Sequence, residues 1–195
     1  MSIARRLTPE ARRTQLVDVA LELFAAGGHQ GVGLDDVATA AGVRRGLLYR
    51  YFPSGKPDLY LAVVEESWCR LVARIDTDRK RPVEDKLPAN VATFLALAAA
   101  GDPAVRVLSQ ATRVDEPRVR SVTREARRAW ARRIAENHLG VGDPAEPVIA
   151  ALVGYLSLAQ VLMEEWLIHA TVERGQVEAV LEGALPPIVA VARGL

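Results

Sequence analysis

The residues best suited to recognition chemistry crowd into one short stretch of the sequence, GVRRGLLYRYF, residues 42–52. It contains Arg44, Arg45, Tyr49, Arg50 and Tyr51. A guanidinium presents five N–H donors in a planar fork that matches paired oxygen acceptors, and a phenol adds another donor. Eleven residues are too few to build a core, so this stretch indicates a surface for an acceptor-rich, anionic partner.

The distribution of charge supports an anionic partner for the N-terminal part. The 195 residues carry 25 basic and 24 acidic side chains, a net charge of +1. Residues 1–56 hold eight basic and five acidic side chains (+3), which leaves 17 basic and 19 acidic (−2) for residues 57–195. Such an asymmetry is a modest indication of binding by the N-terminal segment.

Composition also bounds the environment of the protein. The single cysteine, Cys69, allows no internal disulfide, which fits a reducing cytosol. The N-terminus lacks the apolar core of a signal peptide. The longest apolar stretch, Val148–Met163, is interrupted by Gly154, Ser157 and Gln160, and we interpret it as a buried helix. We therefore expect a soluble, cytoplasmic protein with no membrane partner.

The elements that position these residues are expected to be helices only. Apolar residues recur at helical spacing and period-two alternation is missing, so we predict an all-α protein. The first helix begins at Thr8, with Pro9 at its first position, and Gly27-Gly28 stops it. The further expected helices cover residues 34–40, 44–51, 57–75, 84–100, 102–113, 116–139, 144–171 and 174–193.

Prolines are expected to interrupt two of these helices. Pro88 and the pair Pro186-Pro187 lie inside helical patterns. A proline there removes a backbone hydrogen bond and clashes with the preceding turn, which predicts a break or kink.

Two short helices joined at Gly42 have the pattern of a helix-turn-helix. Ala38 and Ala41 are small enough for the helices to pack closely, and Gly42 tolerates the positive φ of the turn. Val43 fills the gap between the helices. The second helix then presents its N-terminal residues to the edges of DNA bases.

Residues 35–59, DDVATAAGVRRGLLYRYFPSGKPDL, resemble the DNA-binding core of the TetR family of bacterial transcriptional regulators. The positions that match the family pattern are Asp36, Val37, Ala38, Ala41, Gly42, Val43, Leu48, Tyr49, Tyr51, Phe52, Lys56 and Leu59. The resemblance covers residues 8–66. It implies a three-helix DNA-binding domain over 1–55 and a helical domain for ligand binding and dimerisation over 56–195.

The sequence departs from the family pattern at three places. Gly33 stands where relatives have a Ser or Thr cap, and Arg44 stands where the recognition helix begins with Ser. The turn before Lys56 is one residue longer than the common form. These departures leave the individual base contacts open.

The resemblance implies a set of residues that contact DNA: Arg44, Arg45, Gly46, Leu47, Tyr49, Arg50, Tyr51 and Lys56. Arg44 and Arg45 suit bidentate contact with guanine, Leu47 a thymine methyl, and Arg50 and Tyr51 phosphates. The alternative for each is a solvated or structural side chain. Leu48 and Phe52 are the expected core anchors, and Arg5 and Arg6 form either an arm against DNA or a solvated tail.

The C-terminal part contains candidates for a small-molecule site, where aromatic residues with a few polar groups are typical. They are Trp68, Trp130, Tyr155, Met163, Trp166 and His169. Each is also interpretable as core or interface. Cys69 is expected to be buried and inert, and the basic stripe of Arg120, Arg124, Arg128 and Arg132, with Arg127 beside it, to be a solvated helix face.

No pattern in the sequence favours an enzyme. The three histidines fall in no metal-ligand spacing, and no phosphate-binding glycine loop or nucleophile elbow is found, so we expect no metal and no cofactor. The expected function is a repressor, dimeric through residues 144–171 and 174–193, that binds a double-stranded DNA operator and is released by a small-molecule effector. The alternatives are a helical ligand-binding protein without operator-specific regulation and a ligand-processing enzyme.

Overall fold

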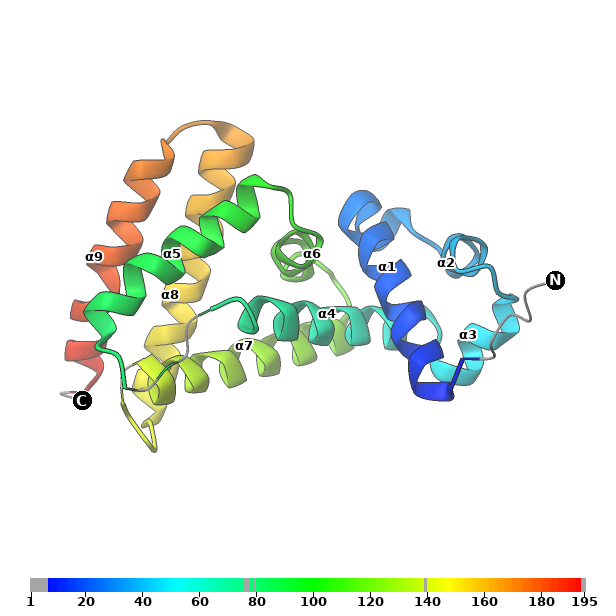
Figure 1. Cartoon of the computed structure of the whole chain (residues 1–195), viewed down its shortest axis with the longest axis horizontal. Helices are drawn as coiled ribbons and strands as arrows, with labels where there is room; N and C mark the ends of the chain where they lie inside the picture. The colour runs from blue at the N-terminus through cyan, green and yellow to red at the C-terminus, as the bar shows by residue number, and fades with distance from the viewer. Residues whose placement is uncertain (1–6, 76–77, 79, 139, 194–195) are drawn as a thin grey trace. The chain divides into compact units, whose positions relative to one another are not determined.

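The computed structural model describes residues 7–75, 78, 80–138 and 140–193 (Figure 1). Every regular element in the described residues is helical, which confirms the all-α prediction. The described residues form two compact units, one within 1–70 and 103–123 and the other within 71–102 and 124–195. The helices are α1 Pro9–Gly31, α2 Leu34–Ala40, α3 Arg45–Tyr51, α4 Lys56–Val72, α5 Val83–Ala99, α6 Pro103–Ala111, α7 Pro117–His138, α8 Glu146–Glu164, the π-helical turn η1 Glu165–His169 and α9 Arg174–Arg193.

Helix α1 begins as its sequence predicts, and it is interrupted at the expected glycine pair. The Thr8 hydroxyl accepts a hydrogen bond from the Ala11 amide at 3.2 Å, and Pro9 occupies the first turn. The backbone leaves the helical region at Gly28, where φ is 70° and ψ is 171°. A last helical turn nevertheless continues to Gly31. The glycine pair therefore interrupts the helix at Gly28, as predicted, and a short second helical stretch follows it.

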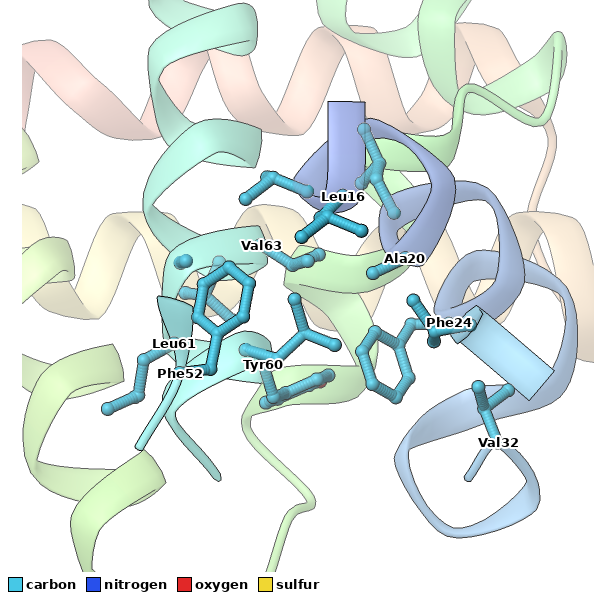
Figure 2. Packing of buried hydrophobic residues seen from close by; sticks show 14 of the residues in the cluster. Leu16, Ala20, Phe24, Val32, Phe52, Tyr60, Leu61 and Val63 are labelled. Carbon is cyan, nitrogen blue, oxygen red and sulfur yellow. The ribbon is translucent and has the colours of Figure 1, made fainter. Parts of the chain in front are cut away.

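The core of the first unit forms between α1 and α4 (Figure 2). Phe24 of α1 meets Tyr60 of α4 edge to face, with ring centroids 5.0 Å apart. Phe52, which follows α3, joins the same cluster. Its other buried members include four residues that come much later in the chain, Val107, Ala111, Val114 and Val119.

Those four residues explain why α6 and the start of α7 belong to the first unit. Helix α6 packs against α1, and its apolar face completes the core that α1 begins. The functional boundary expected between residues 55 and 56 stays a prediction. By packing, the first unit also contains most of α4 and the segment 103–123.

The second and third helices have the geometry of a helix-turn-helix. Gly42 has a φ of 65°, and the Val43 amide donates to the Ala38 carbonyl at 2.9 Å across the turn. Ala38 and Ala41 are buried where the helices meet. Helix α3 begins at Arg45, one residue later than expected, and Arg44 is its N-cap with extended backbone.

The second unit consists of α5, the later part of α7, α8, η1 and α9. Helices α8 and α9 pack against each other, and the Tyr155 hydroxyl of α8 donates to the Leu181 carbonyl of α9 at 3.0 Å. Helix α5 passes through Pro88, and α9 passes through Pro186 and Pro187. None of these prolines ends its helix, so the expected break is not found, whereas a kink at these positions stays a prediction.

Helix α8 buries one face only, which corrects the interpretation of Val148–Met163 as a buried helix. Its buried residues are Val148, Ile149, Leu152, Tyr155, Ala159 and Met163. Among the described residues, one helical segment, Glu146–His169, is long and apolar enough to cross a membrane by itself, and 28% of its most apolar stretch is buried. Helices α5 and α6 together would pass the same test only if they were counted as one broken span. Apolar side chains of α8 and η1 therefore remain exposed in the single chain: Val161, Leu167 and Ile168.

Leu47 and Leu48 give a matched pair for testing the anchoring of α3. Leu48 is 0% exposed, and Leu47 is half-buried. We expect Leu48→Ala to lower the free energy of unfolding by about 2–5 kcal/mol, because truncation leaves a cavity in the core. Leu47→Ala should cost about 1 kcal/mol or less. Urea unfolding followed by circular dichroism measures both, and equal losses would contradict the assignment of Leu48 as the anchor.

Candidate functional site

The outer side of α3 carries most of the residues predicted to contact DNA. Arg44, Arg45, Gly46, Tyr49 and Arg50 are exposed, and Leu47, Tyr51 and Lys56 are half-buried. Leu48 and Phe52 lie on the opposite side of the helix and are buried in the core of the first unit. The structure thus brings the predicted residues together on one surface, which we call the α3 surface, whereas their contacts with DNA stay predictions.

Arg45 is held in place by two neighbours. Its Nη1 donates to Asp35 Oδ2 of α2 at 2.7 Å, and its Nη2 donates to the Tyr49 hydroxyl at 3.2 Å. The guanidinium carbon also lies 5.7 Å from the centroid of the Tyr49 ring, within the range of a cation–π contact. The hydrogen bond with Tyr49 and the charge of Asp35 raise the pKa of Arg45. Asp35 and Tyr49 therefore orient the charged Arg45 guanidinium in the protein without a ligand.

The two other arginines of the α3 surface are not held in this way. Within the described residues, the guanidinium groups of Arg44 and Arg50 make neither a hydrogen bond nor an ion pair. Both are free to follow the position of a phosphate. The three arginines of GVRRGLLYRYF are thus unequal in structure, a difference that their sequence does not reveal.

The turn before α4 brings Gly55, which precedes the predicted phosphate contact Lys56, close to the Tyr49 ring. Gly55 has a φ of 74°, and a Cβ atom at this position would lie 3.3 Å from Cε1 of Tyr49. Glycine is required here both for the backbone conformation and for the approach of the ring. Lys56 then begins α4.

A carboxylate already occupies the first turn of α4. Asp58 accepts the Ser54 amide at 2.7 Å, and Arg118 of α7 contacts Asp58 Oδ1 at 2.6 Å and Ser54 Oγ at 3.0 Å. These contacts, led by the Ser54 amide, lower the pKa of Asp58. The negative charge of Asp58 thus lies two residues after Lys56 in the first turn of α4, and Lys56 would contact a phosphate mainly through its own charge.

His29 is a partly buried histidine of the first unit, close enough to Lys56 to be affected by its charge. The His29 ring meets the Tyr60 ring with centroids 4.6 Å apart, and its Nε2 is 4.0 Å from Glu116 Oε2. Burial, followed by the nearby charge of Lys56, lowers the pKa of His29, while Glu116 opposes them. A lowered folded-state pKa means that the unfolded chain takes up the proton first, so any stability linked to neutral His29 declines as pH falls through its unfolded-state pKa.

The residues predicted to bind a small molecule are divided between the two units. Trp68 belongs to the first unit, where it is half-buried against the core. The other five belong to the second unit: Trp130, Tyr155 and Met163 are buried, Trp166 is half-buried and His169 is exposed. The Tyr155 hydroxyl is engaged with Leu181, so its role within the unit is to join α8 and α9. Ligand binding by these residues stays a prediction.

Two side chains differ from the sequence interpretation. Cys69 is exposed and not buried, because it lies on the other side of α4 from the buried Ser67. Arg127 is not on a solvated face: it is half-buried and donates to Ser157 Oγ at 3.1 Å and Gln160 Oε1 at 2.7 Å, joining α7 to α8. Burial lowers the pKa of Arg127. The sequence contains one signal for this contact. Ser157 and Gln160 are polar residues in an otherwise apolar helix, and such residues indicate a buried polar or charged partner.

Arg120, Arg128 and Arg132, three of the four arginines of the stripe, are paired with acids at the surface. Arg120 contacts Asp115 at 2.5 Å, and Arg128 and Arg132 both contact Glu146. This pattern fits the solvated helix face expected from the sequence.

Comparison with known proteins identifies a matching family model and several similar proteins. A family model described as bacterial regulatory proteins, tetR family, matches residues 16–63. The chain is similar to the HTH-type transcriptional activator FasR of Mycolicibacterium smegmatis, with 32% identity over 130 residues, which are 64% of this chain and 57% of that protein. The chain therefore spans little more than half the length of this curated relative.

Solved structures extend the likeness over nearly the whole chain. A tetR-family transcriptional regulator from Streptomyces coelicolor matches with a TM-score of 0.74 and 28% identity, covering 96% of this chain and 84% of that one. FadR from Bacillus subtilis, solved in complex with stearoyl-CoA, matches with a TM-score of 0.67 and 20% identity, covering 90% and 97%. At that identity, FadR is evidence for the fold alone.

The surroundings of His29 predict how its pKa responds to substitution. Lys56→Gln removes a cation and should raise the pKa of His29, whereas Glu116→Gln removes an anion and should lower it further. Lys80→Gln, in the other unit, is a matched control and should leave this pKa unchanged. An NMR titration of the imidazole resonances measures all three. An unchanged or lower pKa in Lys56→Gln would show that Lys56 does not act on His29.

Proposed function

The chain belongs to the tetR family of bacterial regulatory proteins, and on that premise we propose that it is a sequence-specific DNA-binding transcriptional regulator. The observation that carries the proposal is the division of α3 into two sides. Leu48 is buried on one side, and Arg44, Arg45 and Tyr49 are exposed on the other. A helix held this way can enter the major groove while its anchor stays in the core.

The side chains of the α3 surface are suited to contacts with base edges and to contacts with phosphates, and a regulator of this kind needs both. The guanidinium groups match the O6 and N7 acceptors of guanine, and Leu47 can approach a thymine methyl. Arg50, Tyr51 and Lys56 lie farther along and would contact phosphates, which set the register of the protein on the duplex. DNA binding would take place in the cytoplasm, and we propose no catalytic role for the chain.

We propose that two copies of the chain pair through α8, η1 and α9, so that two α3 helices reach one operator. Single recognition helices read few base pairs, and a two-fold dimer reads two half-sites. Large apolar side chains are exposed on these elements: Val161, Leu167, Ile168 and Val180. A second copy is a better cover than lipid, because α8 also carries Ser157 and Gln160, both bonded to the charged Arg127.

We further propose that a small-molecule effector binds the second unit and releases the protein from DNA. The effector must prefer the conformation that does not bind DNA, because only a difference in affinity between two states shifts their populations. FadR, which shares the fold, is bound to stearoyl-CoA in its structure, so an acyl-CoA is a rational first probe. We propose repression as the mode of action, although FasR is named an activator.

The remaining alternative is a protein of the same fold that binds a ligand without regulating an operator. It would show no preference among DNA sequences. DNA binding at several salt concentrations separates the alternatives, since a specific complex survives salt that abolishes random association.

Removal of both leading arginines should abolish much of the sequence preference. We expect Arg44→Ala with Arg45→Ala to lower the ratio of operator to random-DNA affinity by about tenfold or more, because one bidentate guanine contact contributes about 1–3 kcal/mol of discrimination. Fluorescence anisotropy on DNA from upstream of the gene measures the ratio.

The matched control is Arg106→Ala with Arg120→Ala, which removes the same charge from exposed positions of α6 and α7 in the same unit. A retained ratio in the first double variant would place specificity elsewhere. A wild-type protein without any preference would contradict the regulator itself. Addition of stearoyl-CoA to the complex then tests release.

Introduction of a charge into the exposed apolar face should weaken the dimer. We expect wild-type protein to sediment as a dimer and Val161→Glu or Ile168→Glu to raise the dissociation constant by about tenfold or more, because an unpaired carboxylate is costly to bury. Ala96→Glu, on the exposed side of α5, is the control and should not dissociate it. Analytical ultracentrifugation measures each, and an unaffected dimer in both apolar-face variants would exclude this interface.

A further inference from the structure

We propose that Asp35 is a positioning residue for sequence readout: it fixes the Arg45 side chain so that Arg45, and not Arg44, reads a base. This inference rests on the proposed DNA-binding function. It concerns a residue that matches no position of the family pattern found in the sequence, and it assigns different roles to two adjacent arginines.

The first support is the geometry around Arg45. Asp35 Oδ2 accepts from Nη1 at 2.7 Å, and the Tyr49 hydroxyl accepts from Nη2 at 3.2 Å. The guanidinium is thus held from α2 on one side and from its own helix on the other, with the Tyr49 ring 5.7 Å from its carbon atom. A guanidinium has five N–H donors. Two are used here, and three remain for a partner.

The second support is that the ion pair does little for the fold. The side chains of Arg45 and Asp35 are 52% and 70% exposed, and exposed ion pairs contribute little to stability. Capping of α2 does not need Asp35 either, because Asp36 accepts the Gly33 amide at 2.7 Å. The geometry of Asp35 therefore serves Arg45 more than it serves α2.

The third support is charge. Asp35 places a carboxylate beside a surface that would otherwise be basic, and a carboxylate there repels phosphates and weakens association with any DNA. Asp35 would thus lower the affinity for all DNA sequences, but by orienting one donor group it would raise the preference for one sequence over others. Arg44 and Arg50, which no described residue holds, are suited to phosphates, because a phosphate can be met from many directions.

The test is selection of duplexes from random-sequence DNA by the full-length protein, followed by measurement of each base preference. The variants are Asp35→Ala, Asp35→Asn, Arg45→Ala and Arg44→Ala. Glu22→Ala is the control, since Glu22 is an exposed acid on α1 of the same unit. We expect Arg45→Ala and Asp35→Ala to lose preference at the same base pair, by about fivefold or more in each case.

Asp35→Asn separates orientation from charge. Its side-chain oxygen can still accept from Arg45, so the base preference should be largely retained while affinity for random DNA rises, as it should also rise in Asp35→Ala. Arg44→Ala should weaken binding to all sequences about equally, and Glu22→Ala should leave the selected sequence unchanged.

An unchanged base preference in Asp35→Ala would overturn the inference without affecting the proposed function. So would loss of a base preference in Arg44→Ala but not in Arg45→Ala. Equal loss of preference in Asp35→Asn and Asp35→Ala would also overturn it, because orientation would then not be the cause. If wild-type protein selects no sequence, the proposed function fails and the inference fails with it.

Discussion

The burial of Leu48 and Phe52 is the constraint on which the rest of the α3 surface depends. Helix α3 has seven residues, and an isolated helix of that length is not stable in water. It persists because Leu48 is enclosed between α2 and the core of α1 and α4, with Phe52 closing its end. Every property of the exposed side, including the direction of Arg45, follows from a helix that cannot rotate about its own axis.

Local sequence signals were sufficient for the elements of this unit and for the surface they share. The cap at Thr8, the positive φ at Gly42 and the buried positions of α2 and α3 depend on neighbours a few residues away. The same holds for the exposure of Arg44, Arg45 and Tyr49. Patterns over four to eight residues carry this information, and the all-α prediction rests on them.

Features that depend on distant contacts were not predictable from such patterns. Asp35 and Arg45 are ten positions apart and meet only once α2 and α3 have packed. The sequence pattern predicts a solvated position for Arg127, because its partners lie thirty or more positions away, on α8. The prolines in α5 and α9 are accommodated inside continuous helices, since packing can outweigh a missing backbone hydrogen bond.

The contribution of α6 to the first core has a consequence for modularity. The face of α1 that is not covered by α4 is covered by Val107 and Ala111, which the chain supplies after an excursion of more than thirty residues through the second unit. The first unit of this protein is therefore not one contiguous segment of the chain. Recombination that joins residues 1–70 to a foreign C-terminal half would need a compatible α6, which limits how such regulators can exchange their parts.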